Sequence, residues 1–219
     1  LVGDRELGPE GGFDGTPDYW MHQTDKGDRI LFDVGPLACD HLPAHGHADL
    51  SQVTATIAGR DAIVDTGNFE YEAGDMRVYC RSTSAHNVMQ LDDREQCDVW
   101  SSFRMGRRGH PGDLHRGELA DHQWCSVVHD GFGCPTGRIV LGSNASWTIV
   151  DWFSQLAGDT MATSRLHWHP DWVGVRLLLD TSVEPSLPVI SLGGTDTLTI
   201  SIGSGETMVL SMKDGALVE

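Results

Sequence analysis

The chain has 219 residues, of which 39% are hydrophobic and 21% charged, and its formal net charge is −17 at pH 7. This composition fits one globular domain with a sizeable core and excludes collagen-like, coiled-coil and low-complexity proteins. The negative charge argues against partners such as nucleic acid or an anionic membrane surface, because the long-range field repels both. No apolar run approaches the length that spans a bilayer.

The N-terminal segment LVGDRELGPEGG has no initiating Met and lacks the basic and apolar regions of a signal peptide. We therefore expect a fragment of a longer protein, in which residues 1–15 form a linker or tail and residues 16–219 form one domain. The five cysteines include no C-x-x-C pair and are odd in number. They argue against a zinc ribbon or a full disulfide framework.

Short segments with strand character follow one another along the chain. The first are residues 28–35 (DRILFDVG) and 51–67, and the second reads as a hairpin that turns at 58–61. Another strand with an acidic turn is expected within 86–99. Later pieces alternate or run apolar between Gly, Asn and Asp clusters: QWCSVVHDGF, GRIVLGSNASWTIVDWF, SRLHWHPDW, VRLLLDT and DTLTISIGSGETMVLSM. Because no segment shows sustained helical periodicity, we predict an all-β fold, an antiparallel, supersandwich-like β-sandwich with little helix.

A histidine-rich stretch, HGHAD, lies between two of these expected strands. Residues two apart face the same side of an extended chain, so His45 and His47 would present two imidazoles together. Such a pair is half of a zinc site, and metal-bound imidazoles usually need a carboxylate or carbonyl at the other ring nitrogen. Asp49, Asp65 and Asn87 are candidates for ligands or for that supporting role.

The same histidines could instead form ordinary hydrogen bonds at a strand end, which is the commoner role of a lone histidine. We favour a functional role because HGHAD is followed by Asp65 in AIVDTG and by His86 in SAHNV. Three histidines and two carboxylates in ordered motifs are more specific than an isolated H-x-H.

Several motifs occur in a fixed order over residues 28–172: D-x-G-P, H-G-H-A-D, a strand pair ending V-D-x-G, and R-x-Y-x-R-S-T-x-A-H-N, followed by VWSSFRMGRR, HDGF and LHWHPD. Together they resemble the C-terminal β domain of the heparinase II/III-like polysaccharide lyases. The resemblance implies a metal ion, usually zinc, with His47, Asp65 and His86 as ligands. It also implies that His45 faces the substrate cleft.

The resemblance further implies β-elimination on a uronic-acid-containing polysaccharide. A base removes the proton beside the carboxylate, the carboxylate is neutralised, and the 4-linked oxygen leaves with help from an acid. Histidine titrates near neutrality, so His45 is suited to share this proton transfer. The metal would organise the site rather than perform the elimination.

Family members carry an N-terminal helical toroid that supplies a catalytic tyrosine and groups that neutralise the substrate carboxylate. No part of this sequence reads as that toroid, so we expect it as a partner domain in the full-length protein and expect the chain alone to be inactive. Tyr71 and Tyr79 are the tyrosines near the motifs, and we expect both to be packing residues.

A local excess of basic residues occurs within FRMGRRGHPGDLHRG, which contains Arg104, Arg107, Arg108 and Arg116 with one acid, Asp113. Guanidinium groups bind carboxylates and sulfates bidentately, so this strip could bind an acidic glycan despite the negative net charge. The alternative is a solvated loop whose arginines form surface ion pairs.

Two other functions stay open: a non-catalytic β-sandwich module that binds glycan or metal, and a cupin-like metal barrel, which also uses H-x-H. A helical domain encoded upstream would favour the lyase. Heparan-like glycosaminoglycan, alginate and bacterial exopolysaccharide are all compatible substrates. A bacterial periplasmic or secreted protein is expected, and a cytoplasmic location stays open.

Overall fold

The computed structural model describes residues 18–154 and 160–172, together with the backbone of four later strands: β13 (Val189–Gly193), β14 (Thr197–Ser201), β15 (Thr207–Lys213) and β16 (Ala216–Val218). The predicted tail, residues 1–15, lies outside the described residues. No helix in the described part of the chain is long and apolar enough to cross a membrane.

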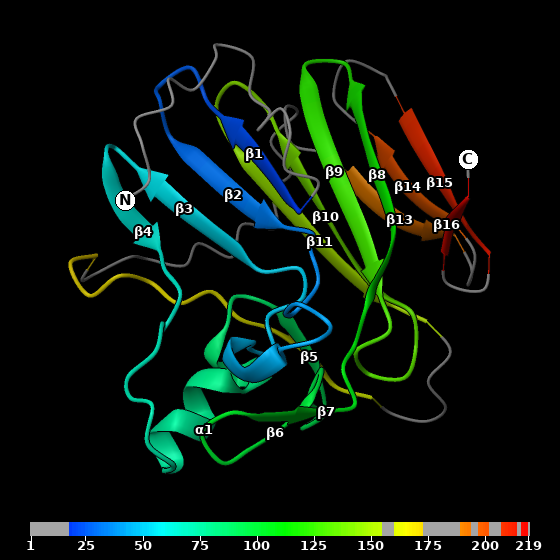
Figure 1. Ribbon diagram of the computed structural model, residues 1–219. Helices are drawn as coiled ribbons and strands as arrows, with labels where there is room; N and C mark the ends of the chain where they lie inside the picture. The colour runs from blue at the N-terminus through cyan, green and yellow to red at the C-terminus, as the bar shows by residue number, and fades with distance from the viewer. Residues whose placement is uncertain are drawn as a thin grey trace.

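The first sheet is antiparallel, in the order β1-β2-β3-β4 (Figure 1). Its strands are β1 (Tyr19–Gln23), β2 (Arg29–Asp33), β3 (Val53–Ile57) and β4 (Arg60–Ile63). The predicted hairpin is β3–β4, and its two turn residues, Ala58 and Gly59, have φ values of +51° and +73°. Two positive φ values match the backbone twist of a tight hairpin, and glycine adopts them without steric cost.

The second sheet has the order β11-β10-β9-β8 and faces the first. Its strands are β8 (Pro111–Leu119), β9 (His122–His129), β10 (Thr136–Gly142) and β11 (Trp147–Phe153). Apolar side chains of both sheets form the core between them: Trp20, Ile30, Phe32, Val34, Val53, Ala55, Ile63, Cys125, Val127 and Val140. This arrangement confirms the predicted all-β sandwich.

Strand β10 is buried along its whole length, so both faces of the second sheet are covered. Val140 faces the core shared with the first sheet, whereas Ile139 and Leu141 point the other way and are equally buried. The third sheet, β13-β14-β15-β16, lies on the side of the second sheet that is away from β1–β4 in Figure 1.

A smaller layer of loops and short elements lies below the sheets in Figure 1. It contains two two-stranded ladders, β5 (Met89–Leu91) with β12 (Ala162–Ser164) and β6 (Asp98–Trp100) with β7 (Arg104–Gly106), and the short helices η1 (Pro43–His45), α1 (Asp75–Arg81) and η2 (Thr83–Ala85). The single strand expected within 86–99 is thus two short ones. The sequence pattern did not reveal α1 because seven residues are too few to establish a helical period.

A buried ion pair joins this layer to the second sheet. Arg138 of β10 is 1% exposed, and its Nε and Nη2 donate to the carboxylate of Asp151 on β11 at 2.7 and 2.9 Å. Its Nη1 donates to the carbonyl oxygens of Ser51 and Asn87. Burial alone would raise the pKa of Asp151, but the Arg138 guanidinium holds that pKa below its usual range.

Replacing Arg138 by Met should destabilise the protein by about 3–5 kcal/mol, because the Asp151 carboxylate would stay buried without its partner. Urea unfolding followed by circular dichroism measures the change. Arg138→Met combined with Asp151→Leu should recover part of the loss, and exposed Arg29→Met should have little effect. A loss below about 1 kcal/mol for Arg138→Met would contradict this role.

Candidate functional site

The histidine-containing motifs of the sequence meet in the layer below the first sheet in Figure 1. HGHAD lies in the connection between β2 and β3, Asp65 follows the end of β4, and His86 follows η2. The loop after β4 is fixed locally, because the backbone N–H of Gly67 donates to Oδ1 of Asp65 at 2.6 Å. The β3–β4 hairpin therefore carries the carboxylate to the same end of the sheet as the histidine loop.

His47, Asp65 and His86 lie together, as the sequence predicts. The ring centroids of His47 and His86 are 5.2 Å apart, and Nδ1 of His86 lies 2.6 Å from Oδ2 of Asp65. His86 is completely buried, whereas the Asp65 side chain is 29% exposed. The three side chains thus form one cluster that solvent reaches from the carboxylate side.

The cluster supplies two imidazole nitrogens and a carboxylate, a donor set that suits zinc. Among the described residues, however, no group of three or more His, Cys, Asp or Glu side chains is arranged so that it could hold a metal ion. The short contact between His86 Nδ1 and Asp65 is a hydrogen bond, as when a carboxylate orients a ligand histidine. His86 Nε2 is buried without a hydrogen-bond partner and is therefore available as a metal ligand.

The electrostatics of the cluster favour a neutral His47 and an ionised Asp65. Burial, and after it the neighbouring His86, lowers the pKa of His47 to about 4. Burial would raise the pKa of Asp65, but the hydrogen bond with His86 holds it below its usual range. Asp49 differs, because burial raises its pKa to about 7. Within the described part of the chain no hydrogen bond joins the Asp49 side chain to a histidine, so its supporting role stays a prediction.

Asn87 connects the strands around the cluster. Its Nδ2 donates to the carbonyl oxygens of Val53 and Val64, each at 2.9 Å. Its Oδ1 accepts from the backbone N–H of His167 at 2.6 Å and lies 3.0 Å from Nδ1 of the His167 ring. Asn87 thus holds the backbone beside Asp65 rather than a ring nitrogen of His47 or His86.

His167 is a member of this neighbourhood that the sequence pattern did not assign. Residues 167–169 run beside β4: the N–H of Val64 donates to the carbonyl of His167, and the N–H of His169 donates to that of Ala62. Trp168 forms an isolated antiparallel bridge with Ile63 between these bonds. Only this pairing across about a hundred residues brings His167 to Asn87, so no local signal could have revealed it.

His45 lies apart from the cluster, and the expectation that it shares a strand face with His47 is wrong. It ends the short helix η1 and is exposed, so HGHAD is not an extended strand. Its ring meets the edges of Tyr71 and Phe103 at centroid distances of 5.9 and 5.6 Å. Tyr71 is 57% exposed and packs against His45 and Phe103 at the surface rather than in the core.

The histidine loop is held by Arg81, which the sequence analysis also missed. Nε of Arg81 donates to the carbonyl of Gly46 at 3.1 Å, and the carbonyl of Arg81 accepts from the N–H of Ala48. These two bonds flank His47 in the chain. They fix the loop so that His45 and His47 point to different neighbours.

The predicted basic strip is largely occupied by interactions within the protein. Arg107 pairs with Asp98 at 3.1 Å, and Arg108 lies 3.5 Å from Asp40. Arg104 on β7 is exposed and has no hydrogen bond or ion pair among the described residues. Arg107 and Arg108 therefore form surface ion pairs, as expected if the strip is a solvated loop. Substrate binding by the strip stays a prediction.

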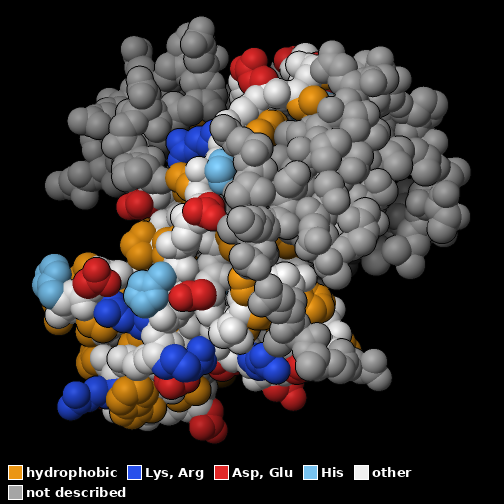
Figure 2. Space-filling view, turned by 90° about the vertical axis from the view of Figure 1, so that its right-hand side faces the viewer, with side chains coloured by type: hydrophobic (Ala, Val, Ile, Leu, Met, Phe, Trp, Pro, Cys, Tyr) orange, Lys and Arg blue, Asp and Glu red, His pale blue; other side chains and the backbone are white. Residues whose placement is uncertain are grey.

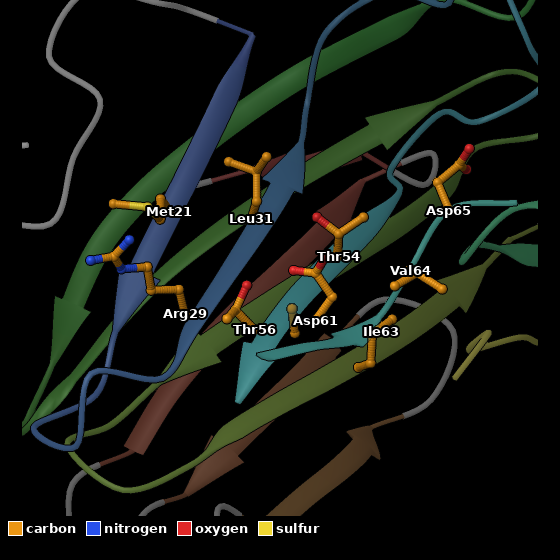
Figure 3. A pocket seen from close by; sticks show the side chains of 10 residues that line it. Met21, Arg29, Leu31, Thr54, Thr56, Asp61, Ile63, Val64 and Asp65 are labelled. Atoms are coloured by element: carbon orange, nitrogen blue, oxygen red, sulfur yellow. The ribbon is translucent and has the colours of Figure 1, made fainter. Parts of the chain in front are cut away.

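A groove of about 370 Å³ lies on the outer face of the first sheet (Figure 3). Asp65 lies at one end of it, and the other lining residues come mainly from β1 to β4: Met21, Arg29, Leu31, Thr54, Ala55, Thr56, Asp61, Ile63 and Val64. The groove mixes apolar side chains with hydroxyl and charged groups, so it offers both contact area and hydrogen bonds beside the cluster.

Comparisons with known proteins support the family resemblance that the ordered motifs indicate. The chain matches the family model described as "Heparinase II/III-like, C-terminal" over residues 5–217. It is similar to the solved structure of a heparinase III gene product, with a TM-score of 0.53 and 16% identity, over 94% of this chain and 28% of that one. It is also similar to heparan sulfate lyase HepC from Pedobacter heparinus, with a TM-score of 0.50 and 16% identity, over 88% of this chain and 27% of that one. No curated protein matches.

Replacing Asn87 by Ala should lower the free energy of unfolding by about 3 kcal/mol, because it leaves two buried carbonyls and the His167 N–H without their partner. Asn87→Asp should be no better, since a carboxylate cannot donate to the carbonyls. Urea unfolding measures both variants. Exposed Asn144→Ala is the matched control and should change stability by less than about 0.5 kcal/mol; equal behaviour of the two alanine variants would refute this role.

Proposed function

The chain belongs to the heparinase II/III-like C-terminal family, and from this premise we propose that it is the β domain of a lyase that cleaves uronic-acid-containing polysaccharide by β-elimination. The observation that supports this proposal most is the convergence of His47, Asp65 and His86 beside the loop that presents His45. The similar structures are about 16% identical and support the fold alone, so activity and substrate are part of the proposal.

His45 is the proposed proton-transfer residue of this chain. It is exposed and makes no hydrogen bond among the described residues, so both ring nitrogens are accessible to a substrate. Its contacts with Tyr71 and Phe103 fix the position of the ring without occupying those nitrogens. A histidine whose ring nitrogens are accessible in this way can act as a general acid or base.

We propose that zinc is the resident metal and that His47, Asp65 and His86 hold it. The donor set and the unpartnered, buried Nε2 of His86 support this assignment. When bound, the ion would supply positive charge that orders the three side chains. The residues of the chain then have separate tasks: Arg81 holds the loop, Asp65 orients His86, and His45 remains outside the metal-binding set.

The proposed substrate is an acidic polysaccharide, and the proposed partner is an N-terminal helical toroid in the full-length protein. The similar structures are named heparinase III and heparan sulfate lyase, which favours a heparan-like glycosaminoglycan over alginate or exopolysaccharide. The chain spans 28% and 27% of those structures, which leaves room for such a domain in proteins of this kind. A large extracellular substrate fits a periplasmic or secreted location.

The purified 219-residue chain should not degrade uronate polysaccharides at an enzymatic rate, because the catalytic tyrosine and other groups are expected on the helical domain. The absorbance of the unsaturated uronate product measures this. In the full-length protein, His45→Ala should reduce kcat by about 10²–10⁴, the usual contribution of general acid–base catalysis, whereas exposed His41→Ala should not. Robust product formation by the isolated chain would overturn the division of the active site between two domains.

Replacing His47 by Ala should release zinc and lower the melting temperature, because metal binding is coupled to folding. His45→Ala should leave both metal content and melting nearly unchanged. Elemental analysis of protein purified without chelator, with differential scanning calorimetry, tests the pair of variants. The absence of stoichiometric metal in the parent protein, or equal zinc loss in both variants, would refute the assignment of ligands.

A further inference from the structure

Two arginines of α1 are buried without a carboxylate. Arg77 and Arg81 are 1% and 0% exposed, and they lie one turn apart on the same side of the helix. Neither forms an ion pair with Asp or Glu in the part of the chain that the structure describes. Two like charges are therefore buried side by side, although the chain contains 32 Asp and Glu residues.

The hydrogen bonds of this pair leave one nitrogen of each guanidinium unused. Nε of Arg77 and Nη1 of Arg81 both donate to the carbonyl of Ser102, at 2.9 and 3.3 Å. Arg77 Nη1 also donates to Oδ1 of Asn68, and Arg81 Nε to the carbonyl of Gly46. Nη2 of Arg77 and Nη2 of Arg81 are both buried without a partner.

Burying a charge without a counter-charge costs several kcal/mol, and an unpartnered donor adds to that cost. The neighbours of the pair are neutral: carbonyls, an amide, aromatic rings and the Cys97 thiol, whose pKa burial raises to about 12. A strained arrangement of this kind is characteristic of a site that an external group completes. The missing group must be an anion that accepts hydrogen bonds.

The pair shares two aromatic neighbours with the proposed proton-transfer residue. The Arg77 guanidinium is 5.4 Å from the ring centroid of Tyr71 and 5.7 Å from that of Phe103, the same two rings that contact His45. Both rings are about half exposed and stack on each other at 6.1 Å. Figure 2 shows Lys or Arg side chains and hydrophobic side chains, with some acidic ones among them, on the lower part of the molecule, where Figure 1 places α1, β6 and β7.

We propose that Arg77 and Arg81 form an anion site for a carboxylate or sulfate group of an acidic sugar, covered by Tyr71 and Phe103 and adjacent to His45. The anion reaches the guanidinium groups when the exposed Tyr71 ring turns aside, and it accepts hydrogen bonds from the two unused Nη2 atoms. Arginine suits this task because its planar donors match the oxygens of both anions.

This inference rests on the proposed function and deepens it. In β-elimination the carboxylate beside the departing proton must be neutralised, and we expected the helical domain to supply every group for that step. The position of Arg77 and Arg81 instead implies that this chain helps to neutralise the substrate carboxylate. A carboxylate held at Arg77 would lie beside the imidazole that exchanges the proton.

The test measures anion binding by the 219-residue chain directly, without turnover. Sodium glucuronate and sodium sulfate are titrated separately at constant ionic strength, with sodium chloride as reference. Binding is followed by the NMR signals of the arginine Nε–H groups and by the melting temperature. We expect saturable shifts of the Arg77 and Arg81 signals and a higher melting temperature with at least one of the two anions; the stronger ligand distinguishes a carboxylate site from a sulfate site.

Arg77→Gln should weaken this binding at least about tenfold, since it removes the charge and the unused donor, and Arg77→Lys should weaken it less. The matched control is exposed Arg60→Gln on β4, which should bind as the parent does. If Arg77→Gln does not fold, the NMR titration of the parent chain decides alone. Absence of saturable shifts, or equal binding by a folded Arg77→Gln variant, overturns the proposal.

Failure of the anion-site proposal is distinguishable from failure of the proposed function. Loss of the anion site would leave a lyase whose carboxylate is neutralised by other residues, and the full-length protein would still form unsaturated product. Conversely, an intact anion site in a full-length protein without lyase activity would refute the proposed reaction and keep the site.

Discussion

The buried ion pair between Arg138 and Asp151, which has two hydrogen bonds, is the interaction on which the site depends. One side of the Arg138 guanidinium is fixed by the Asp151 carboxylate on the neighbouring strand, so the remaining nitrogen can point only toward the site layer. There it holds the carbonyls of Ser51 and Asn87, one at the start of β3 and the other next to His86. Because Asn87 in turn binds the start of β3 and the residue after β4, a single cation orders backbone segments that are 51 to 87 residues away in sequence.

The site layer is assembled mainly from side chain to backbone hydrogen bonds. Asn87, Arg81 and Arg138 all bind carbonyl oxygens of loops, and Gln96 binds both the N–H and the carbonyl of Leu50 just after HGHAD. Such bonds replace the regular ladder that a loop lacks and keep its buried polar groups satisfied. The exceptions are therefore informative: Nε2 of His86 and the two Nη2 atoms on α1 are unsatisfied at the places where chemistry is proposed.

Sequence reasoning was most successful where the information is local or carried by motifs. Alternating residues predicted the β3–β4 hairpin, and the ordered motifs brought His47, Asp65 and His86 together before any fold was known. It failed where tertiary contacts decide the conformation: the H-G-H segment looks extended, but Arg81 and η1 turn its two rings apart. The charged strip was overinterpreted for a similar reason, since the partners of Arg107 and Arg108 come from β6 and from the connection between β2 and β3.

The pairing of residues 167–169 with β4 has a consequence beyond placing His167. An open edge strand presents unpaired N–H and C=O groups that can recruit a strand of another molecule and start aggregation. The bonds at Val64 and Ala62 occupy that edge, and Trp172 adds a bond from its indole nitrogen to the carbonyl of Asp61. The strand that leads to the cluster of His47, Asp65 and His86 is thereby protected from intermolecular pairing, while the groove on the outer face of the sheet stays beside it.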